Sequence, residues 1–133
     1  MPVVDASVVV EYLTFGEHAE EARERLLDED HALWAPHLVD AEVGHALRRE
    51  VRLGELDAEV AGEALWQLDE LPLRRVSHEF LIRYAWALRD NVSFYDALYV
   101  ALAEMLGEPL ITFDARLARA GVHAEIEVLA QAA

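Results

Sequence analysis

Four acidic residues come from four separate predicted elements and are expected at one edge of a predicted sheet: Asp5, Glu42, Asp96 and Asp114. Four carboxylates in one cleft repel one another and raise each other's pKa values. They stay ionised together only when cations neutralise them, and oxygen ligands favour Mg²⁺ or Mn²⁺. A carboxylate-held cation of this kind is the usual device for in-line attack of water on a phosphodiester. The four acids together therefore predict metal-assisted phosphodiester hydrolysis.

Each acid also has an ordinary structural explanation. Asp5 and Asp114 could cap the helices that follow them, because aspartate accepts hydrogen bonds from free amides at a helix start. Asp96 lies three residues after Ser93, which is the spacing of a variant capping box. A glutamate on a helix, such as Glu42, is by default solvated. No single acid decides between these explanations, so the hydrolase hypothesis depends on the set.

Short apolar runs alternate with helical periodicity along the whole chain. The predicted strands are the residues just before Asp5 and the ranges 32–35, 73–76, 110–113 and 127–129. The predicted helices are 7–13, 17–27, 38–53, 57–71, 78–89, 93–106 and 114–119. This alternation is typical of a parallel sheet covered by helices on both faces. In such sheets the functional crevice lies at the carboxyl ends of the strands, where Asp5 and Asp114 fall.

The composition excludes several classes of protein. The chain has 133 residues, 54% of them apolar, which predicts one domain over residues 1–133. It has no cysteine, so a disulfide framework, a zinc–thiolate site and a thiol nucleophile are excluded. All 11 basic residues are arginine, which excludes phosphoryl-transfer sites that need a lysine. The start of the chain does not fit a signal peptide, and the longest apolar stretch, 97–103, is too short for a bilayer. We therefore expect a cytoplasmic protein without membrane contact.

Four segments form a pattern that is more specific than any single acid. They are Val3-Val4-Asp5-Ala6-Ser7; Ala35-Pro36-His37-Leu38 with Ala41-Glu42-Val43; Phe94-Tyr95-Asp96-Ala97-Leu98-Tyr99-Val100-Ala101-Leu102-Ala103; and Pro109-Leu110-Ile111-Thr112-Phe113-Asp114-Ala115-Arg116-Leu117. In this order, over nearly the whole chain, they resemble the motifs of PIN-domain ribonucleases. Within that family the chain resembles the VapC-type toxins of bacterial type II toxin–antitoxin pairs.

The resemblance implies a fold, a cofactor and partners. The fold would be a three-layer α/β/α sandwich around a parallel sheet of four to five short strands. The cofactor would be one or two Mg²⁺ or Mn²⁺ ions, and the reaction would be hydrolysis of single-stranded RNA to a 3′-hydroxyl and a 5′-phosphate. The protein would form a homodimer and be neutralised by a VapB-like antitoxin.

The resemblance also assigns roles to residues. The metal-binding and catalytic set carries over as Asp5, Glu42, Asp96 and Asp114. Ser7 and Thr112 carry over as hydroxyls that hydrogen-bond the carboxylates or the metal-bound water, although ordinary backbone capping would explain them too. In the expected mechanism a metal held by Asp5 and Asp96 lowers the pKa of a bound water. Asp114 or Glu42 then holds that water, or a second ion.

The net charge of −15 would repel the substrate of a ribonuclease, because RNA is a polyanion. Three arginines just after Glu42 are candidates for holding RNA phosphates through forked hydrogen bonds: Arg48, Arg49 and Arg52. They could equally complement the dipole at the end of their helix. The same two explanations apply to the pairs Arg74/Arg75 and Arg116/Arg119.

A second hypothesis belongs to a different class: a non-catalytic acidic module that binds another protein. Trp34, Trp66 and Trp86 would serve such an interface, although tryptophans are more often part of a core. The apolar faces of helices 17–27 and 57–71 are candidates for contact with an antitoxin. Convergence of the four acids would favour the enzyme, whereas scattered and solvated acids would favour the interaction module.

Overall fold

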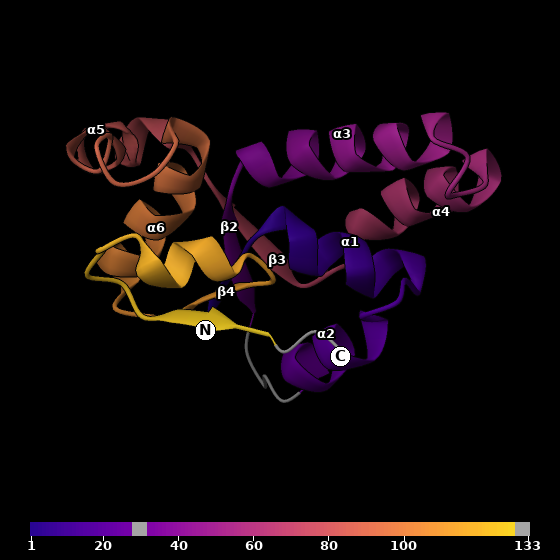
Figure 1. Ribbon diagram of the computed structural model, residues 1–133, viewed down its shortest axis with the longest axis horizontal. Coiled ribbons are helices and arrows are strands. Elements are labelled where there is room, and N and C mark those ends of the chain that lie inside the picture. Colours follow the sequence, from indigo (N-terminus) through magenta and orange to yellow (C-terminus); the bar gives the residue numbers. More distant parts are fainter. Residues whose placement is uncertain (28–31, 130–133) are drawn as a thin grey trace.

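A parallel sheet of five short strands forms the centre of the computed structural model, which describes residues 1–27 and 32–129 (Figure 1). The strands are β1 (Val3–Val4), β2 (Leu33–Pro36), β3 (Leu73–Val76), β4 (Leu110–Thr112) and β5 (Ile126–Val128). Their order across the sheet is β3-β2-β1-β4-β5, and every neighbouring pair is parallel. The predicted parallel sheet of four to five short strands is confirmed.

The central strand β1 consists of Val3 and Val4 alone and is held between β2 and β4. Val3 pairs with Trp34 of β2 on one side and with Leu110 of β4 on the other. Val3 and Val4 are both fully buried. A strand covered on both faces is expected to be apolar throughout, which is the pattern that made it recognisable in the sequence.

The helices lie in two layers on either side of the sheet (Figure 1). Six α-helices are described: α1 (Ala6–Thr14), α2 (Ala19–Leu27), α3 (Leu38–Arg52), α4 (Ala58–Leu68), α5 (Ile82–Ala87) and α6 (Phe94–Leu106). Helix α6 packs on β1, β2 and β4, and α5 packs on α6. In the other layer α1 is in contact with α2, α3 and α4. The three-layer α/β/α sandwich is thus confirmed.

Two predicted helices differ from the structure. The range 78–89 is split into a 3-10 turn, η1 (His78–Phe80), and α5, with the break at Leu81. Leu81 is fully buried, so its packing in the core takes precedence over a continuous helix. The range 114–119 forms a 3-10 helix, η2 (Ala115–Arg119), rather than an α-helix.

The tryptophans do not all belong to the core. Trp34 is partly buried against it, but Trp66 on α4 is 76% exposed and Trp86 on α5 is 60% exposed. Treating tryptophan as core was therefore wrong at these two positions. Helix α4 already buries the side of Ala61, Ala64 and Leu68, which leaves Trp66 in solvent.

The apolar face of α2 is not available to a partner. Ala19, Ala22 and Leu26 are buried within the chain, where α2 packs on α1. The prediction that this face contacts an antitoxin was therefore wrong. Helix α4 uses its main apolar face in the same way, but Val60, Leu65 and Trp66 remain exposed on it.

The parallel arrangement brings the carboxyl ends of the strands to one edge of the sheet. Asp5 follows β1, and Asp114 lies two residues after the end of β4. Helix α3, with Glu42 in its second turn, begins directly after β2, and the sheet order makes β2 and β4 the two neighbours of β1. The fold therefore directs three of the four predicted acids to the same edge, and α6 adds Asp96. None of the described helices is long and apolar enough to cross a membrane.

One arginine ties β3 to the layer of α3. The Arg75 guanidinium donates to both carboxylate oxygens of Asp40 at 2.7–2.9 Å, and to the carbonyls of Leu68 and Leu73. The fork that could have held an RNA phosphate is therefore occupied by a partner within the chain. Arg74, its neighbour, is exposed and lies over the ring of Trp34.

We expect Arg75→Ala to lower the free energy of unfolding by about 1–3 kcal/mol, because it leaves Asp40 and two carbonyls without their charged donor. Arg74→Ala is the matched control and should change this free energy by less than about 1 kcal/mol. Urea denaturation of the three proteins measures both values. Equal destabilisation by the two substitutions would contradict a structural role for Arg75.

Candidate active site

Asp5 is both the cap of α1 and the centre of a hydrogen-bond network. Its Oδ1 accepts from the backbone N–H groups of Ser7 (3.1 Å) and Val8 (3.4 Å) and from the Ser7 hydroxyl (2.6 Å). Its Oδ2 accepts from the hydroxyl of Thr112. The capping explanation drawn from the sequence is confirmed, and the same contacts fix the orientation of the carboxylate.

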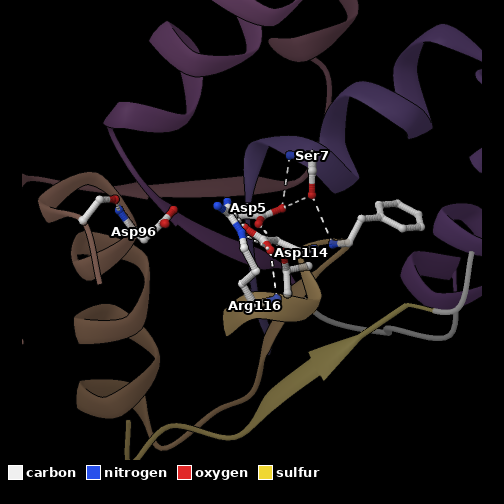
Figure 2. Close-up of polar contacts among 8 residues, drawn as sticks. Asp5, Ser7, Asp96, Asp114 and Arg116 are labelled. Carbon is white, nitrogen blue, oxygen red and sulfur yellow. Dashed lines mark hydrogen bonds and ion pairs between the residues drawn. The ribbon is translucent and has the colours of Figure 1, made fainter. Parts of the chain in front are cut away.

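The two hydroxyls also connect Asp5 to the segment after β4. Thr112, which is fully buried, accepts from the backbone N–H of Asp114 at 2.9 Å while it donates to Asp5. The Ser7 hydroxyl accepts from the backbone N–H of Phe113 at 3.2 Å. The start of α1 and the loop that carries Asp114 are therefore held together through Asp5 (Figure 2).

Burial perturbs the ionisation of Asp5. The residue keeps some solvent exposure, but its carboxyl group is closely surrounded by protein, and this raises its pKa to about 6. The hydrogen bonds from Ser7 and Thr112 oppose the rise, and the negative charge of Asp96 adds to it. Among the described residues, no positively charged side chain acts to lower this pKa.

Glu42 is held by a tyrosine that the sequence analysis did not select. The hydroxyl of Tyr99 donates to Glu42 Oε1 at 2.6 Å, and Tyr99 is 2% exposed. Burial raises the pKa of both groups, and the charge of Asp96 raises the pKa of Glu42 further. Tyr99 had a signal in the sequence: a phenol within the buried run 97–103 needs a hydrogen-bond partner, and the nearby acids could supply one.

Asp96 is the acid that interacts electrostatically with the other three. It lies in the first turn of α6, where Ser93 caps the helix by accepting from the Asp96 backbone N–H at 3.2 Å. Burial raises its pKa, and the charge of Asp114 raises it further. Figure 2 shows its carboxylate pointing from α6 toward Asp5 and Asp114.

Asp114 differs from the other acids because an arginine neutralises it. Its Oδ1 accepts from the backbone N–H and Nε of Arg116, both at 3.0 Å, and its Oδ2 accepts from Nη2 at 2.8 Å. This pairing lowers the pKa of Asp114. The sequence had left Arg116 undecided between RNA contact and helix charge, and the structure gives it Asp114 as a partner.

The four acids therefore lie along one edge of the sheet, which we call the acid edge. They are neither scattered nor fully solvated, as the interaction-module hypothesis would require. They are also not preassembled as a ligand set: in residues 1–27 and 32–129, no three acidic or histidine side chains are grouped so as to hold a metal ion. The donor chemistry fits a hard divalent cation, because the donors are carboxylates, the charge of Asp96 raises the pKa of Asp5, and no arginine among the described residues is hydrogen-bonded to either carboxylate.

A groove of about 1040 Å³ extends from the acid edge between α1 and α3. Ser7 and Glu42 line its end at the edge, together with Tyr95. Of the three arginines predicted to contact RNA, Arg49 lines this groove. Arg48 and Arg52 are exposed on the same helix but do not line it.

The fold and the acid edge define a class of protein. A family model described as the PIN domain matches residues 3–122, and the chain belongs to the PIN-domain family. Among curated relatives, Ribonuclease VapC1 of Mycobacterium tuberculosis (strain H37Rv) is 50% identical over 129 residues, which is 96% of either chain. Ribonuclease VapC3 of the same strain is 42% identical over 119 residues, covering 89% of this chain and 85% of the relative.

A solved structure shows the same fold. The crystal structure of M. tuberculosis VapC20, described as a sarcin–ricin loop cleaving toxin, superposes with a TM-score of 0.74. The two share 19% sequence identity over 98% of this chain and 100% of VapC20, so this likeness concerns the fold alone. The resemblance to VapC-type PIN-domain ribonucleases, drawn from the four motifs, is confirmed by the family model and the relatives.

The raised pKa of Asp5 has a consequence for stability in metal-free buffer. The folded pKa of about 6 lies above the ordinary value of 3.8, so the folded chain binds this proton more tightly than the unfolded chain does. The contribution of Asp5 is therefore fully present below about pH 4 and is lost as the pH rises through 6. Asp5→Asn removes this pH dependence.

We expect the stability of Asp5→Asn relative to the unsubstituted chain to improve by about 2–3 kcal/mol between pH 4 and pH 8. Denaturation in EDTA across this range measures it, with Asp90→Asn as a control because Asp90 is exposed. A difference between Asp5→Asn and the unsubstituted chain that stays constant with pH would contradict the prediction.

Proposed function

We propose that this chain, as a single PIN-like domain over residues 1–133, is an Mg²⁺- or Mn²⁺-dependent endoribonuclease that hydrolyses single-stranded RNA. The observation that carries the proposal is the placement of Asp5 and Asp96 at the acid edge: the Asp96 carboxylate points toward Asp5 (Figure 2), both carboxyl groups are desolvated, and the charge of Asp96 adds to the rise in the pKa of Asp5. A divalent cation would favour the ionised form of both carboxyl groups. The named activity of the VapC relatives supports the RNA substrate.

Asp5 and Asp96 would hold the cation, with Glu42 and Asp114 beside it. When bound, such a cation lowers the pKa of water and neutralises charge on a phosphodiester and its leaving oxygen. The products would be a 3′-hydroxyl and a 5′-phosphate.

The chain's own residues prepare this site by fixing side chains in advance. Ser7 and Thr112 hold the Asp5 carboxylate in one orientation. Tyr99 fixes Glu42 through Oε1, and Oε2 has no hydrogen-bond partner among the described residues. This free oxygen is the group that would accept a hydrogen bond from the attacking water. No step requires a lysine or a histidine as base.

The groove between α1 and α3 would receive the RNA. Its end at Ser7 and Glu42 is the end that reaches the acid edge. Arg49 would contact a phosphate within the groove, and Arg48 and Arg52 would contact the strand as it leaves. Because Glu11, Glu50 and Glu55 also line the groove and the charge of the whole chain is −15, binding would depend on these few arginines and on the bound cation.

The relatives and the exposed surface support a toxin role. The chain would act in the cytoplasm as a homodimer and be neutralised by a VapB-like antitoxin, as in other VapC-type systems. Apolar side chains that a protein partner would cover are exposed on α4 and α5: Trp66, Ile82, Tyr84 and Trp86. The same surface would serve a non-catalytic interaction module, which is the second candidate function.

RNA cleavage distinguishes the two functions. Purified chain, free of any partner, is incubated with a panel of labelled single-stranded RNAs in Mg²⁺, Mn²⁺ or EDTA. We expect cleavage in either metal, none in EDTA, and a loss of at least roughly 100-fold in Asp96→Asn, because the cation loses a principal ligand. Asp90→Asn, at an exposed site, should cleave normally. Cleavage that persists in EDTA or in Asp96→Asn would exclude this mechanism.

The link between Tyr99 and Glu42 gives a second prediction. Tyr99→Phe removes only the hydroxyl that orients Glu42, so kcat should fall by roughly 10-fold while KM for RNA changes little. Tyr84→Phe, at an exposed tyrosine on α5, is the control and should leave both constants unchanged. Unchanged kcat in Tyr99→Phe, measured on a protein of normal secondary structure, would show that Glu42 needs no such support.

A further inference from the structure

The acid edge carries one bound cation of its own, the guanidinium of Arg116. Its Nε and Nη2 donate to the two oxygens of Asp114, and its backbone N–H donates to Oδ1. Figure 2 shows the side chain turned back over Asp114 toward the side of the site where Asp96 lies. The same charge acts on Asp96, since it lowers the pKa that burial raises there.

In this ion pair, Arg116 occupies the Asp114 carboxylate, which the proposed metal site would use. An arginine stays positively charged at any pH at which the protein is folded, so Arg116 neutralises Asp114 over that whole pH range. While Arg116 is bound, Asp114 is not a free ligand.

The ion pair between Arg116 and Asp114 is also weak enough for a divalent cation to replace the guanidinium. The Arg116 side chain is 83% exposed and that of Asp114 is 28% exposed, so water screens the attraction. Exposed ion pairs contribute little to stability, and a divalent cation carries twice the charge of a guanidinium. The flat fork of arginine fits a phosphate as well as it fits a carboxylate, so a released guanidinium has a second partner available in RNA.

We propose that Arg116 is the resident counter-cation of the acid edge: it holds Asp114 until a divalent cation enters, and then turns to a phosphate of the RNA. The proposal rests on the function proposed above. It makes Arg116 an internal competitor of the metal and a phosphate contact in the loaded state. A basic side chain at the acid edge would also compensate locally for the acidic charge of the whole chain.

The test uses the full chain with Arg116→Gln, which keeps the side chain polar and removes its charge. Arg119→Gln is the matched control, because Arg119 lies on the same 3-10 helix and is exposed. Mn²⁺ is titrated into each protein without RNA and followed by calorimetry. We expect Arg116→Gln to bind Mn²⁺ roughly 5- to 10-fold more tightly than the unsubstituted chain, because one nearby positive charge is gone. Arg119→Gln should match the unsubstituted chain.

A second measurement addresses the phosphate. At saturating Mn²⁺, KM for single-stranded RNA should rise roughly 5-fold in Arg116→Gln, with kcat within about 2-fold of normal. Unchanged or weaker Mn²⁺ binding in Arg116→Gln would overturn the role as counter-cation, and an unchanged KM would overturn the phosphate contact. Absence of RNA cleavage by the unsubstituted chain would instead defeat the proposed function, and the Mn²⁺ titration would then decide the role of Arg116 alone.

Discussion

The carboxylate of Asp5 is the interaction on which the site depends. One of its oxygens caps α1 through Ser7 and Val8, and the other is held by Thr112 of β4. These contacts join the central strand, the first helix and the neighbouring strand at a single point. Burial disfavours the charge of this carboxylate and raises its pKa to about 6, and a cation bound beside it would favour the ionised form. Structure and proposed chemistry thus share one residue.

The sheet and its covering helices could be predicted because their signals are local. A fully apolar run such as 110–113 and the long periodic helix 38–53 each identify an element from neighbouring residues alone. The break at Leu81 could not be predicted, since it depends on burial of that side chain in the assembled core. The exposure of Trp66 could not be predicted from the sequence either, because it depends on which side of α4 the rest of the fold covers.

The acids of the site could be selected from the sequence, but their partners could not. The placement of Asp5 and Asp114 after apolar strands follows from the general position of crevices in parallel sheets. That Tyr99 holds Glu42 across 57 positions of sequence depends on how α6 and α3 meet, and no local pattern records it. Arg116 is close in sequence to Asp114, yet only the geometry of η2 decides that its side chain turns back. The sequence therefore indicated which acids are candidates for the reaction, and the fold shows which partners restrain each of them.

The proposed activity requires that the acid edge binds a divalent cation between Asp5 and Asp96. The most direct test is a crystal of the full chain soaked in Mn²⁺, with data collected to record the anomalous scattering of manganese. We expect an anomalous peak in contact with the Asp5 and Asp96 carboxylates, with the Arg116 guanidinium displaced from Asp114. A peak confined to other surface acids, or none at the acid edge at saturating Mn²⁺, would contradict it.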